Sequence, residues 1–330
     1  MYHVGGPCHG AISFRAGALW PYRLVTSIYS SLLSLYPAWF SIETNTPVTY
    51  IATQADDPTR PFIVHTPRGQ IAATHIIHAT DAFAANLIPG LKGKLFPVRG
   101  HMTAQRPGSS FPEDMDGNRS WSIIGRRGFE YITQRPGKRS AEALGAELMV
   151  GGGLLAFEDR GLDEVGVWRD DGNSIATSAY LDGFMPAAFG QDEWGNDDHP
   201  SGNRIIQAWT GCMGFTCDLF PFVGRLDSQL TRRKPKVTIG PRKPLRQNQT
   251  QESEPSPSEW ISAGFNGEGM VLGWLSGVAV GLMVLGRDNA NLQKRHGRPE
   301  GKVHDWLPPE LICTPKRVAS TSIYDLARLM

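Results

Sequence analysis

The chain has 330 residues, 40% of them hydrophobic, and a formal net charge of +1. This length exceeds the usual size of one hydrophobic core and predicts two domains, while the near-zero charge gives no electrostatic reason to expect a nucleic acid as partner. The four cysteines form no CxxC pair, and residues 1–14 lack the cationic and apolar regions of a secretory signal. We therefore expect a cytoplasmic protein with reduced thiols.

The first predicted helix begins at Pro21, because apolar residues recur at helical spacing until Pro37 ends the pattern. Asp81 is a candidate cap for a short helix over Ala82–Leu87. Between the two helices lie short β-type runs separated by turn sequences, the last of them apolar enough for an inner strand. These runs are Ser41–Thr44, Pro47–Ile51, Phe62–Thr66, Gln70–Ala73 and His75–Thr80.

From Phe96 the sequence changes to longer β-type runs with polar loops, which predicts a second domain. The expected strands are Pro97–Ala104, Glu130–Gln134, Leu148–Val150, Ile175–Leu181 and Arg204–Trp209. Asp192–Gly202 is predicted to be a polar loop. Ser228–Ser258 is a low-complexity insertion rich in arginine and lysine. Because it lacks aromatic residues for stacking on bases, we expect a disordered surface loop rather than a nucleic-acid-binding patch.

The stretch Trp260–Gly286 contains the longest charge-free apolar run of the chain. It predicts a strand over Trp260–Ala263, a glycine-rich turn, and a helix beginning at Gly269 that is buried nearly all round. At about 27 Å this helix falls just short of a bilayer core, and no second span accompanies it. Its glycine ridge is typical of membrane helices but equally of a helix lying close to a sheet or cofactor.

Two further interpretations concern the glycine turn of this stretch. The turn is a loose nucleotide-binding fingerprint, but its spacing is not G-x-G-x-x-G and no strand follows the helix. Alternatively, the glycines let the backbone approach a ligand, and the helix N-terminus offers free N–H groups and partial positive charge to an electron-rich atom. We favour the second interpretation and expect no membrane span.

Several motifs occur in a fixed order along the chain. They are Gly17-Ala18-Leu19-Trp20-Pro21, Thr46-Pro47-Val48, His78-Ala79-Thr80, Pro97-Val98-Arg99-Gly100-His101-Met102, Trp209-Thr210-Gly211, Asp218, Pro221-Phe222-Val223-Gly224 and Gly264-Phe265-Asn266-Gly267-Glu268-Gly269-Met270. From about Gly10 to Gly286 this set resembles FAD-dependent oxidoreductases of the D-amino-acid-oxidase and glycine-oxidase superfamily. The gamma-glutamylputrescine-oxidase-like members are the most similar.

The resemblance implies an α/β plus α+β fold. An incomplete FAD/NAD(P)-binding, Rossmann-like domain is expected from residues 18–95 and 210–290, with the insertion 228–258. An antiparallel-sheet substrate domain is expected over 96–209, and residues 291–330 form a tail. Members of the superfamily begin with a strand, a G-x-G-x-x-G turn and a helix that this sequence lacks, so residues 1–17 are interpreted as the end of a truncated N-terminal region. The alternative function is a truncated, non-catalytic homologue unable to hold FAD.

The same resemblance implies FAD as cofactor and places particular residues around it. Val48 matches the position near the adenine and Thr80 a strand end near the diphosphate. The turn and helix start would face the pyrimidine edge of the isoalloxazine, where the helix dipole stabilises developing negative charge. The residues of this turn are Gly264, Asn266, Gly267, Glu268, Gly269 and Met270. Cys212 aligns with a cysteine that carries covalent flavin in the sarcosine-oxidase branch, or it is a buried small hydrophobe.

The expected substrate is a small-molecule amine. Met213 occupies the position where members that oxidise α-amino acids carry a carboxylate-binding arginine. A secondary amine or polyamine conjugate therefore fits better than a free amino acid. His101 and Tyr131 are candidate substrate contacts, although both residue types also serve as hydrogen-bonded packing in strands. The expected chemistry, hydride transfer to flavin, requires no acid or base residue and no metal.

Overall fold

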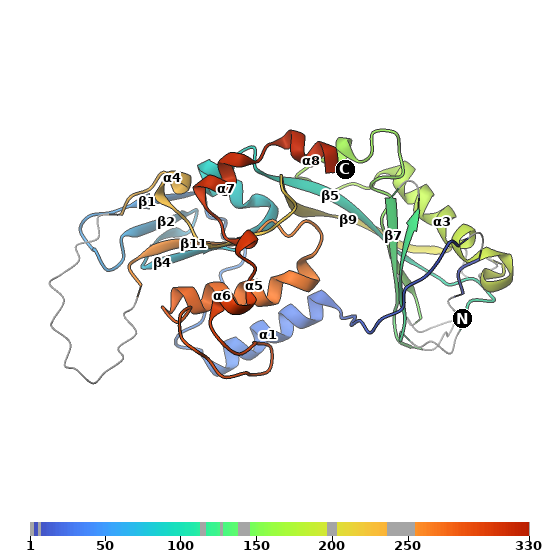
Figure 1. Cartoon of the computed structure of the whole chain (residues 1–330), viewed down its shortest axis with the longest axis horizontal. Coiled ribbons are helices and arrows are strands. Elements are labelled where there is room, and N and C mark those ends of the chain that lie inside the picture. Colours follow the sequence, from blue (N-terminus) through green and yellow to red (C-terminus); the bar gives the residue numbers. More distant parts are fainter. Residues whose placement is uncertain are drawn as a thin grey trace. The chain divides into compact units, whose positions relative to one another are not determined.

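The structure is a computed structural model that describes residues 3–5, 8–112, 117–125, 128–137, 146–196, 203–235 and 255–329 (Figure 1). The chain forms two compact units, each described here by itself. Unit 1 comprises Met1–Thr44, Gly100–Glu164 and Arg169–Gly211, and unit 2 comprises Asn45–Arg99, Val165–Trp168 and Cys212–Met330. The domain boundaries expected from sequence stay predictions. The compact units divide the chain a few residues from the expected boundaries at 95/96 and 209/210, but Met1–Thr44, which includes the first helix, belongs to unit 1.

Unit 1 is built on a five-stranded sheet of order β6-β7-β8-β5-β9, and the pairs β6–β7, β7–β8 and β8–β5 are antiparallel. Strands β5 and β9 contain residues of both units. The elements are α1 (Pro21–Leu35), β5 (Leu95–Gln105), β6 (Ser120–Gly125), β7 (Gly128–Gln134), β8 (Leu148–Gly151), η3 (Leu162–Glu164), α3 (Ile175–Trp194) and β9 (Ile205–Thr216). The sequence interpretation missed β6, and the strand predicted over Ile175–Leu181 is wrong.

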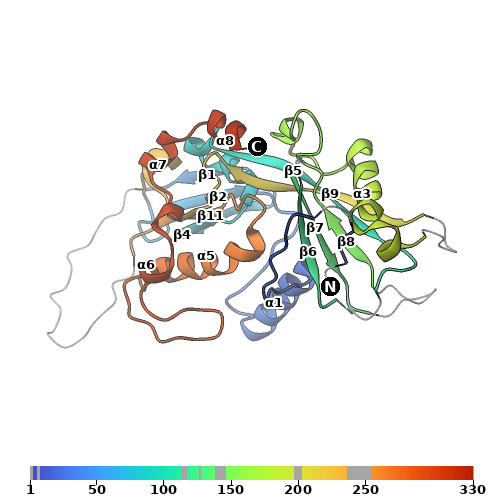
Figure 2. The same ribbon diagram turned by 45° about the vertical axis from the view of Figure 1, so that its right-hand side comes forward.

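Helix α3 covers one face of this sheet, as Figure 2 shows. Ser174 caps the helix by accepting a hydrogen bond from the Thr177 amide at 3.2 Å. The buried residues Thr177, Leu181, Met185 and Phe189 recur every fourth position and form one stripe against the sheet. Residues 175–181 alone contain too few turns to reveal this periodicity. The helix also extends to Trp194, which removes the start of the predicted polar loop Asp192–Gly202, of which 197–202 lie outside the described residues.

Unit 2 contains two three-stranded sheets, one an antiparallel meander of order β1-β2-β3 and one of order β10-β11-β4. In the second sheet β11 pairs parallel with β4 and antiparallel with β10. The strands are β1 (Tyr50–Thr53), β2 (Phe62–Thr66), β3 (Gly69–Ala73), β4 (His75–His78), β10 (Phe222–Arg225) and β11 (Ser258–Ala263). The predicted strand Ser41–Thr44 is wrong, since these residues form an irregular segment and turn.

Helices pack on both faces of the β10-β11-β4 sheet, as parallel strands require. The helices of unit 2 are η1 (Asp81–Phe83), α2 (Ala84–Leu87), η2 (Pro89–Leu91), α4 (Ser228–Thr231), α5 (Gly269–Val284), α6 (Val303–Trp306), η4 (Pro309–Leu311), α7 (Pro315–Ser320) and α8 (Ile323–Leu329). On one face Ile261 and Phe222 pack with Ile88 and Leu91. On the other face lies α5 (Figure 1), whose Ala279 and Val280 pack with Trp260.

Helix α5 is far less buried than its sequence predicts. Only Ser276, Ala279 and Val280 are buried, and Ala279 and Val280 pack with Val223 and Trp260 of the sheet. Exposed apolar side chains on the same helix are Met270, Val271, Trp274 and Leu285. A Cβ atom added to Gly273, Gly277 or Gly281 would meet no neighbour within 4 Å. No helix among the described residues is both long and apolar enough to span a bilayer.

We predict that lysine is tolerated on the open side of α5 and not on its packed side. Val271→Lys should change the free energy of unfolding by less than about 0.5 kcal/mol and reduce fluorescence of the apolar dye ANS. Val280→Lys, the matched control on the same helix, buries an unpaired charge and should cost more than about 3 kcal/mol. Urea unfolding with ANS titration measures both effects, and equal losses in the two variants would contradict an exposed face.

The predicted disordered insertion is partly ordered. Residues 228–231 form α4, whose Leu230 and Thr231 are buried, and Arg233 pairs with a buried carboxylate of β11. The rest of the insertion, 236–254, lies outside the described residues, together with Lys236, Arg242, Lys243, Arg246, Glu252 and Glu254. Local composition missed α4 because a four-residue helix has no period to detect.

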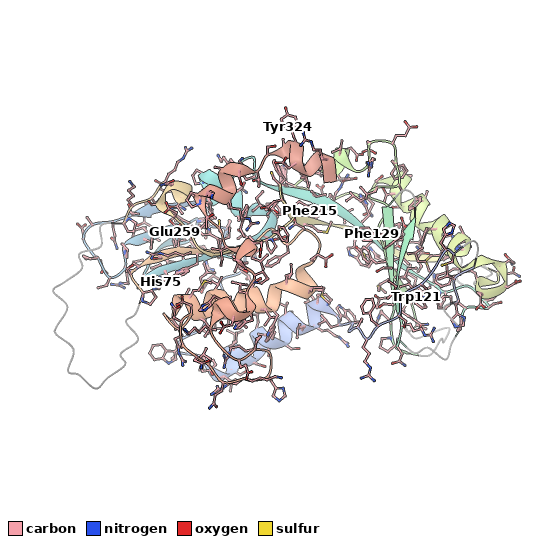
Figure 3. The ribbon with its side chains drawn as sticks, viewed as in Figure 1. His75, Trp121, Phe129, Phe215, Glu259 and Tyr324 are labelled. Carbon is pink, nitrogen blue, oxygen red and sulfur yellow. The ribbon has the colours of Figure 1, made fainter. Side chains whose placement is uncertain are left out.

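A buried charge network links α4 to the parallel strands. Glu259 accepts hydrogen bonds from Arg233 Nε at 2.8 Å and from a terminal nitrogen of Arg233 at 2.7 Å, and lies 2.8 Å from His78 Nε2. Burial raises the pKa of the Glu259 carboxyl, but hydrogen bonds from Arg233 and His78 outweigh it and hold that pKa below its usual range. Glu259 is labelled in Figure 3.

We predict that Glu259→Gln destabilises the protein by about 3 kcal/mol or more, because it leaves the Arg233 charge buried without its partner. A lowered folded pKa stabilises the protein above the unfolded value, about 4.3, and this contribution is lost as pH falls through the folded pKa. The stability of the parent should therefore fall as the pH drops below about 4.3, and the variant, which lacks this carboxyl, should lack that part of the pH dependence. Asp171→Asn, which removes the exposed pair with Arg169, is the control and should cost less than about 1 kcal/mol. Similar costs would contradict the network.

Candidate functional site

The candidate site lies at the carboxyl ends of β4 and β11. Ile261 is paired with His78, so the parallel strands end at the same edge of the sheet. Thr80-Asp81 follows β4, and the glycine turn that begins at Gly264 follows β11. Ligands of open sheets with parallel strands bind outside these carboxyl ends. The edge therefore brings together two of the segments that the sequence identified.

The turn after β11 has a backbone that requires its glycines. Gly264 has a φ of +80° and Gly267 a φ of +85°. A Cβ on Gly264 would lie 2.6 Å from Thr216 Cγ2, so no side chain fits there. A Cβ on Gly267 would have only Met213 Sδ nearby, at 3.8 Å. The outer side of the turn at Gly267 is therefore open, and Met213 lies beside it.

Asn266 fixes the turn to the neighbouring strand β9. Its Oδ1 accepts a hydrogen bond from the Thr216 amide at 2.8 Å, and its Nδ2 donates to the Gly264 carbonyl at 2.7 Å. Its own amide donates to the Gly214 carbonyl at 2.7 Å. The residue has a φ of +55°, a conformation that asparagine adopts more readily than most residues. Asn266 is thus directed inward, as a support of the turn.

Asp81 supports the turn from the β4 side. Its Oδ1 accepts hydrogen bonds from the amides of Gly264 at 2.7 Å and Phe265 at 3.3 Å, and its Oδ2 accepts one from the Gly214 amide at 2.7 Å. The prediction that Asp81 caps the following helix is wrong, because neither η1 nor α2 has a side-chain cap. The carboxylate binds these more distant amides instead.

The N-terminus of α5 completes the site. Glu268 is its N-cap residue and makes no side-chain cap hydrogen bond. Within the described part of the chain, the amides of Gly267, Gly269 and Met270 have no hydrogen-bond acceptor. The helix has 16 residues, so its dipole adds partial positive charge at this end. The turn therefore presents free N–H groups to an electron-rich ligand.

The other predicted cofactor residues of unit 2 have different surroundings. Thr80 is exposed and directly precedes Asp81. Val48 lies before β1 instead of on a strand, with a relative exposure of 39%. Cys212 is half-buried, and its thiol donates to the Val167 carbonyl at 3.7 Å. Val48 makes no hydrogen bond to the turn in the part of the chain that the structure describes.

The two predicted substrate contacts of unit 1 lie on its sheet. His101 is buried on β5, and its Nε2 lies 3.0 Å from Glu164 Oε1. Tyr131 on β7 pairs with Gly151, which pairs with Met102 in turn, so Tyr131 and Met102 share a face. His101 adjoins Met102 in the strand and points to the opposite face. Partial burial raises the pKa of the Tyr131 phenol. Contact with substrate remains a prediction for both residues.

Sequence reasoning missed the role of Asp81 and the participation of Gly214 and Thr216. Asp81 lies 133 residues from Gly214 and 183 from Gly264 along the chain. No local pattern connects positions so far apart. The one available signal is the pair of strand ends, because parallel neighbours place the residues that follow them at a common edge.

We predict that Asn266→Ala destabilises unit 2 by about 2 kcal/mol, because three side-chain hydrogen bonds, with the Thr216 amide and hydroxyl and the Gly264 carbonyl, are lost and alanine is strained at positive φ. Asn266→Gly loses the same hydrogen bonds without the strain and should cost about 1 kcal/mol less. Urea denaturation of the two variants measures the difference. Equal stability of both variants and the parent would mean that Asn266 does not hold the turn.

The two units together give a mixed α/β fold, with a helix-covered parallel pair in unit 2 and a mainly antiparallel sheet in unit 1. The family model described as DAO, FAD dependent oxidoreductase, matches residues 4–282. The chain belongs to this family, whose cofactor is FAD. A comparison with curated proteins gives no match.

Solved structures of similar fold include several oxidases. Glycine oxidase from Geobacillus kaustophilus is 17% identical with a TM-score of 0.47, over 74% of this chain and 49% of that one. Iminodiacetate oxidase from Chelativorans sp. BNC1 is 14% identical with a TM-score of 0.47, over 84% and 58%. Amadoriase I from Aspergillus fumigatus is 13% identical with a TM-score of 0.49, over 82% and 49%. The chain spans about half the length of the first of these structures.

Proposed function

We propose that this protein binds FAD at the glycine turn and oxidises a small-molecule amine or amino-acid-like substrate. The observation that carries the proposal is the set of free amides at Gly267, Gly269 and Met270, at the start of α5. Membership in a family of FAD-dependent oxidoreductases supplies the identity of the cofactor. The hydrogen bonds of Asp81 and Asn266 hold the amides in place.

The residues of the turn fit the edge of a flavin ring. Gly267 has open space where a side chain would stand, so a planar ring can approach the backbone there. The free amides can donate hydrogen bonds to the carbonyl and nitrogen acceptors of such an edge. A bound flavin would supply the acceptor for a hydride from the carbon next to the substrate nitrogen. The helix dipole at Gly269 favours the negative charge that this transfer places near the turn.

Other residues of unit 2 belong to the proposal on weaker grounds. Thr80 adjoins Asp81 at the same sheet edge, which supports a place near the diphosphate. Val48, near the adenine, and Cys212, as a flavin attachment point, rest on the sequence resemblance alone. Each is kept as a proposed contact.

The proposed substrate is a secondary amine or a polyamine conjugate. Met213 Sδ lies beside the open side of the turn, 3.8 Å from the position of a Gly267 Cβ. A thioether cannot pair with a carboxylate, whereas a guanidinium binds one bidentately. An apolar group at this position therefore favours a substrate without a free α-carboxylate. Tyr131 and His101 lie on opposite faces of their sheet, and each is kept as a proposed substrate contact on the sequence resemblance alone.

The test is whether FAD remains with the protein after desalting, measured by its visible absorbance. We expect retention by the parent and loss in Gly267→Val, because a branched side chain at a φ of +85° strains the turn and covers the flavin edge. Gly93→Val is the matched control, since Gly93 has a φ of +74° and open space but lies outside the turn. Both variants should express at the parent level.

Equal FAD occupancy in Gly267→Val and the parent would reject this turn as the flavin site. A colourless parent that cannot be reconstituted with FAD would reject the enzyme function. That result would favour the alternative of a non-catalytic homologue unable to hold FAD.

A further inference from the structure

We infer that Asp81 is the positioning residue that sets the shape of the flavin-facing turn. The inference rests on the proposed function and adds a specific residue to it. Asp81 follows β4, which pairs with the strand that leads into the turn. It acts on the flavin site through the turn backbone, without contacting the ring itself.

The hydrogen bonds of Asp81 converge from two separate segments. One carboxylate oxygen accepts from the Gly264 and Phe265 amides, at 2.7 and 3.3 Å, and the other accepts from the Gly214 amide at 2.7 Å. These amides are the first two of the turn and one from β9. The carboxylate therefore fixes the beginning of the turn to both neighbouring strand segments.

An ionised carboxylate is suited to this position because it only accepts hydrogen bonds. Its two oxygens offer about four acceptor sites for the three amides. An asparagine of the same size has one acceptor oxygen, and its NH2 group would face an amide N–H. Hydrogen bonds to a charged acceptor are also stronger than those to a neutral one.

The backbone of Asp81 supports a specialised role. Its φ is +41°, a conformation that costs most residues free energy and persists where surrounding contacts enforce it. The Asp81 side chain does not cap η1, the helix that begins at this residue. The strain is therefore offset by the three amide hydrogen bonds.

The amides of the turn therefore fall into two groups, those that donate to Asp81 and those that are free for a ligand. Gly264 and Phe265 donate inward to Asp81, whereas Gly267, Gly269 and Met270 remain without acceptors among the described residues. If the inward bonds are lost, the turn can rotate and the outward amides lose their common direction. Flavin affinity should then fall while the rest of the fold persists.

The test is Asp81→Asn in the full chain, with Asp227→Asn as the matched control. Asp227 is also an acceptor for a backbone amide, that of Gln229 at 2.7 Å, but it caps α4 away from the turn. Three readouts are compared: hydrogen exchange of the Gly214, Gly264 and Phe265 amides, the dissociation constant for FAD, and the visible circular dichroism of bound flavin at saturation.

We expect Asp81→Asn to accelerate exchange of these amides about tenfold or more, since each loses about one hydrogen bond. The FAD dissociation constant should rise by a similar factor, and the flavin dichroism should change. Asp227→Asn should leave all three readouts unchanged. The dichroism separates a repositioned turn from a general loss of stability.

Unchanged exchange and unchanged FAD affinity in Asp81→Asn would overturn the inference. If that variant fails to fold, Asp81→Gly replaces it, because glycine relieves the positive φ and still removes every acceptor. A parent that binds no FAD would reject the proposed function. In that case hydrogen exchange is the deciding readout. Faster exchange in the Asp81 variants than in the Asp227→Asn control still supports the positioning role, and unchanged exchange overturns it.

Discussion

The parallel pairing of β4 with β11 is the constraint on which unit 2 depends. The strands are separated by about 180 residues of sequence, yet their register aligns His75 with Ser258 and His78 with Ile261. At the amino ends, His75 Nδ1 accepts hydrogen bonds from the Ser258 amide and the Trp260 indole, at 3.2 and 3.3 Å; His75 is labelled in Figure 3. At the carboxyl ends, Asp81 binds the turn after β11. Side chains thus hold both ends of the pair in register.

The parallel pair also explains where polar and apolar groups are buried. A sheet covered on both faces must bury the polar side chains it carries, and Glu259 is ionised within the core because Arg233 and His78 surround it. The other face is apolar and packs on α5 through Trp260 and Val280. Strand β11 therefore carries a charged network on one face, at Glu259, and an apolar contact on the other, at Trp260. Its carboxyl end supplies the site.

Helix α5 has one buried side and one exposed side, and its amino-acid composition does not tell them apart. Its sequence is apolar on all sides, which predicts complete burial. In unit 2 only Ser276, Ala279 and Val280 of this helix are buried, and a Cβ atom on Gly273, Gly277 or Gly281 would meet no neighbour within 4 Å. The helix start is consequently accessible to a ligand. The exposed apolar side chains Met270, Val271 and Leu285 give this helix a hydrophobic surface that ANS binding can measure.

The sequence by itself determined the elements with strong local signals. Pro21 and Pro37 delimit α1, and the glycines from Gly264 to Gly269 mark the turn and the start of α5, because proline and glycine act on the backbone where they stand. Only the tertiary structure decided what Asp81, Asn266 and Arg233 bind. Their partners are brought near by strand pairing and helix packing between distant parts of the chain, and that proximity leaves no mark in the neighbouring residues.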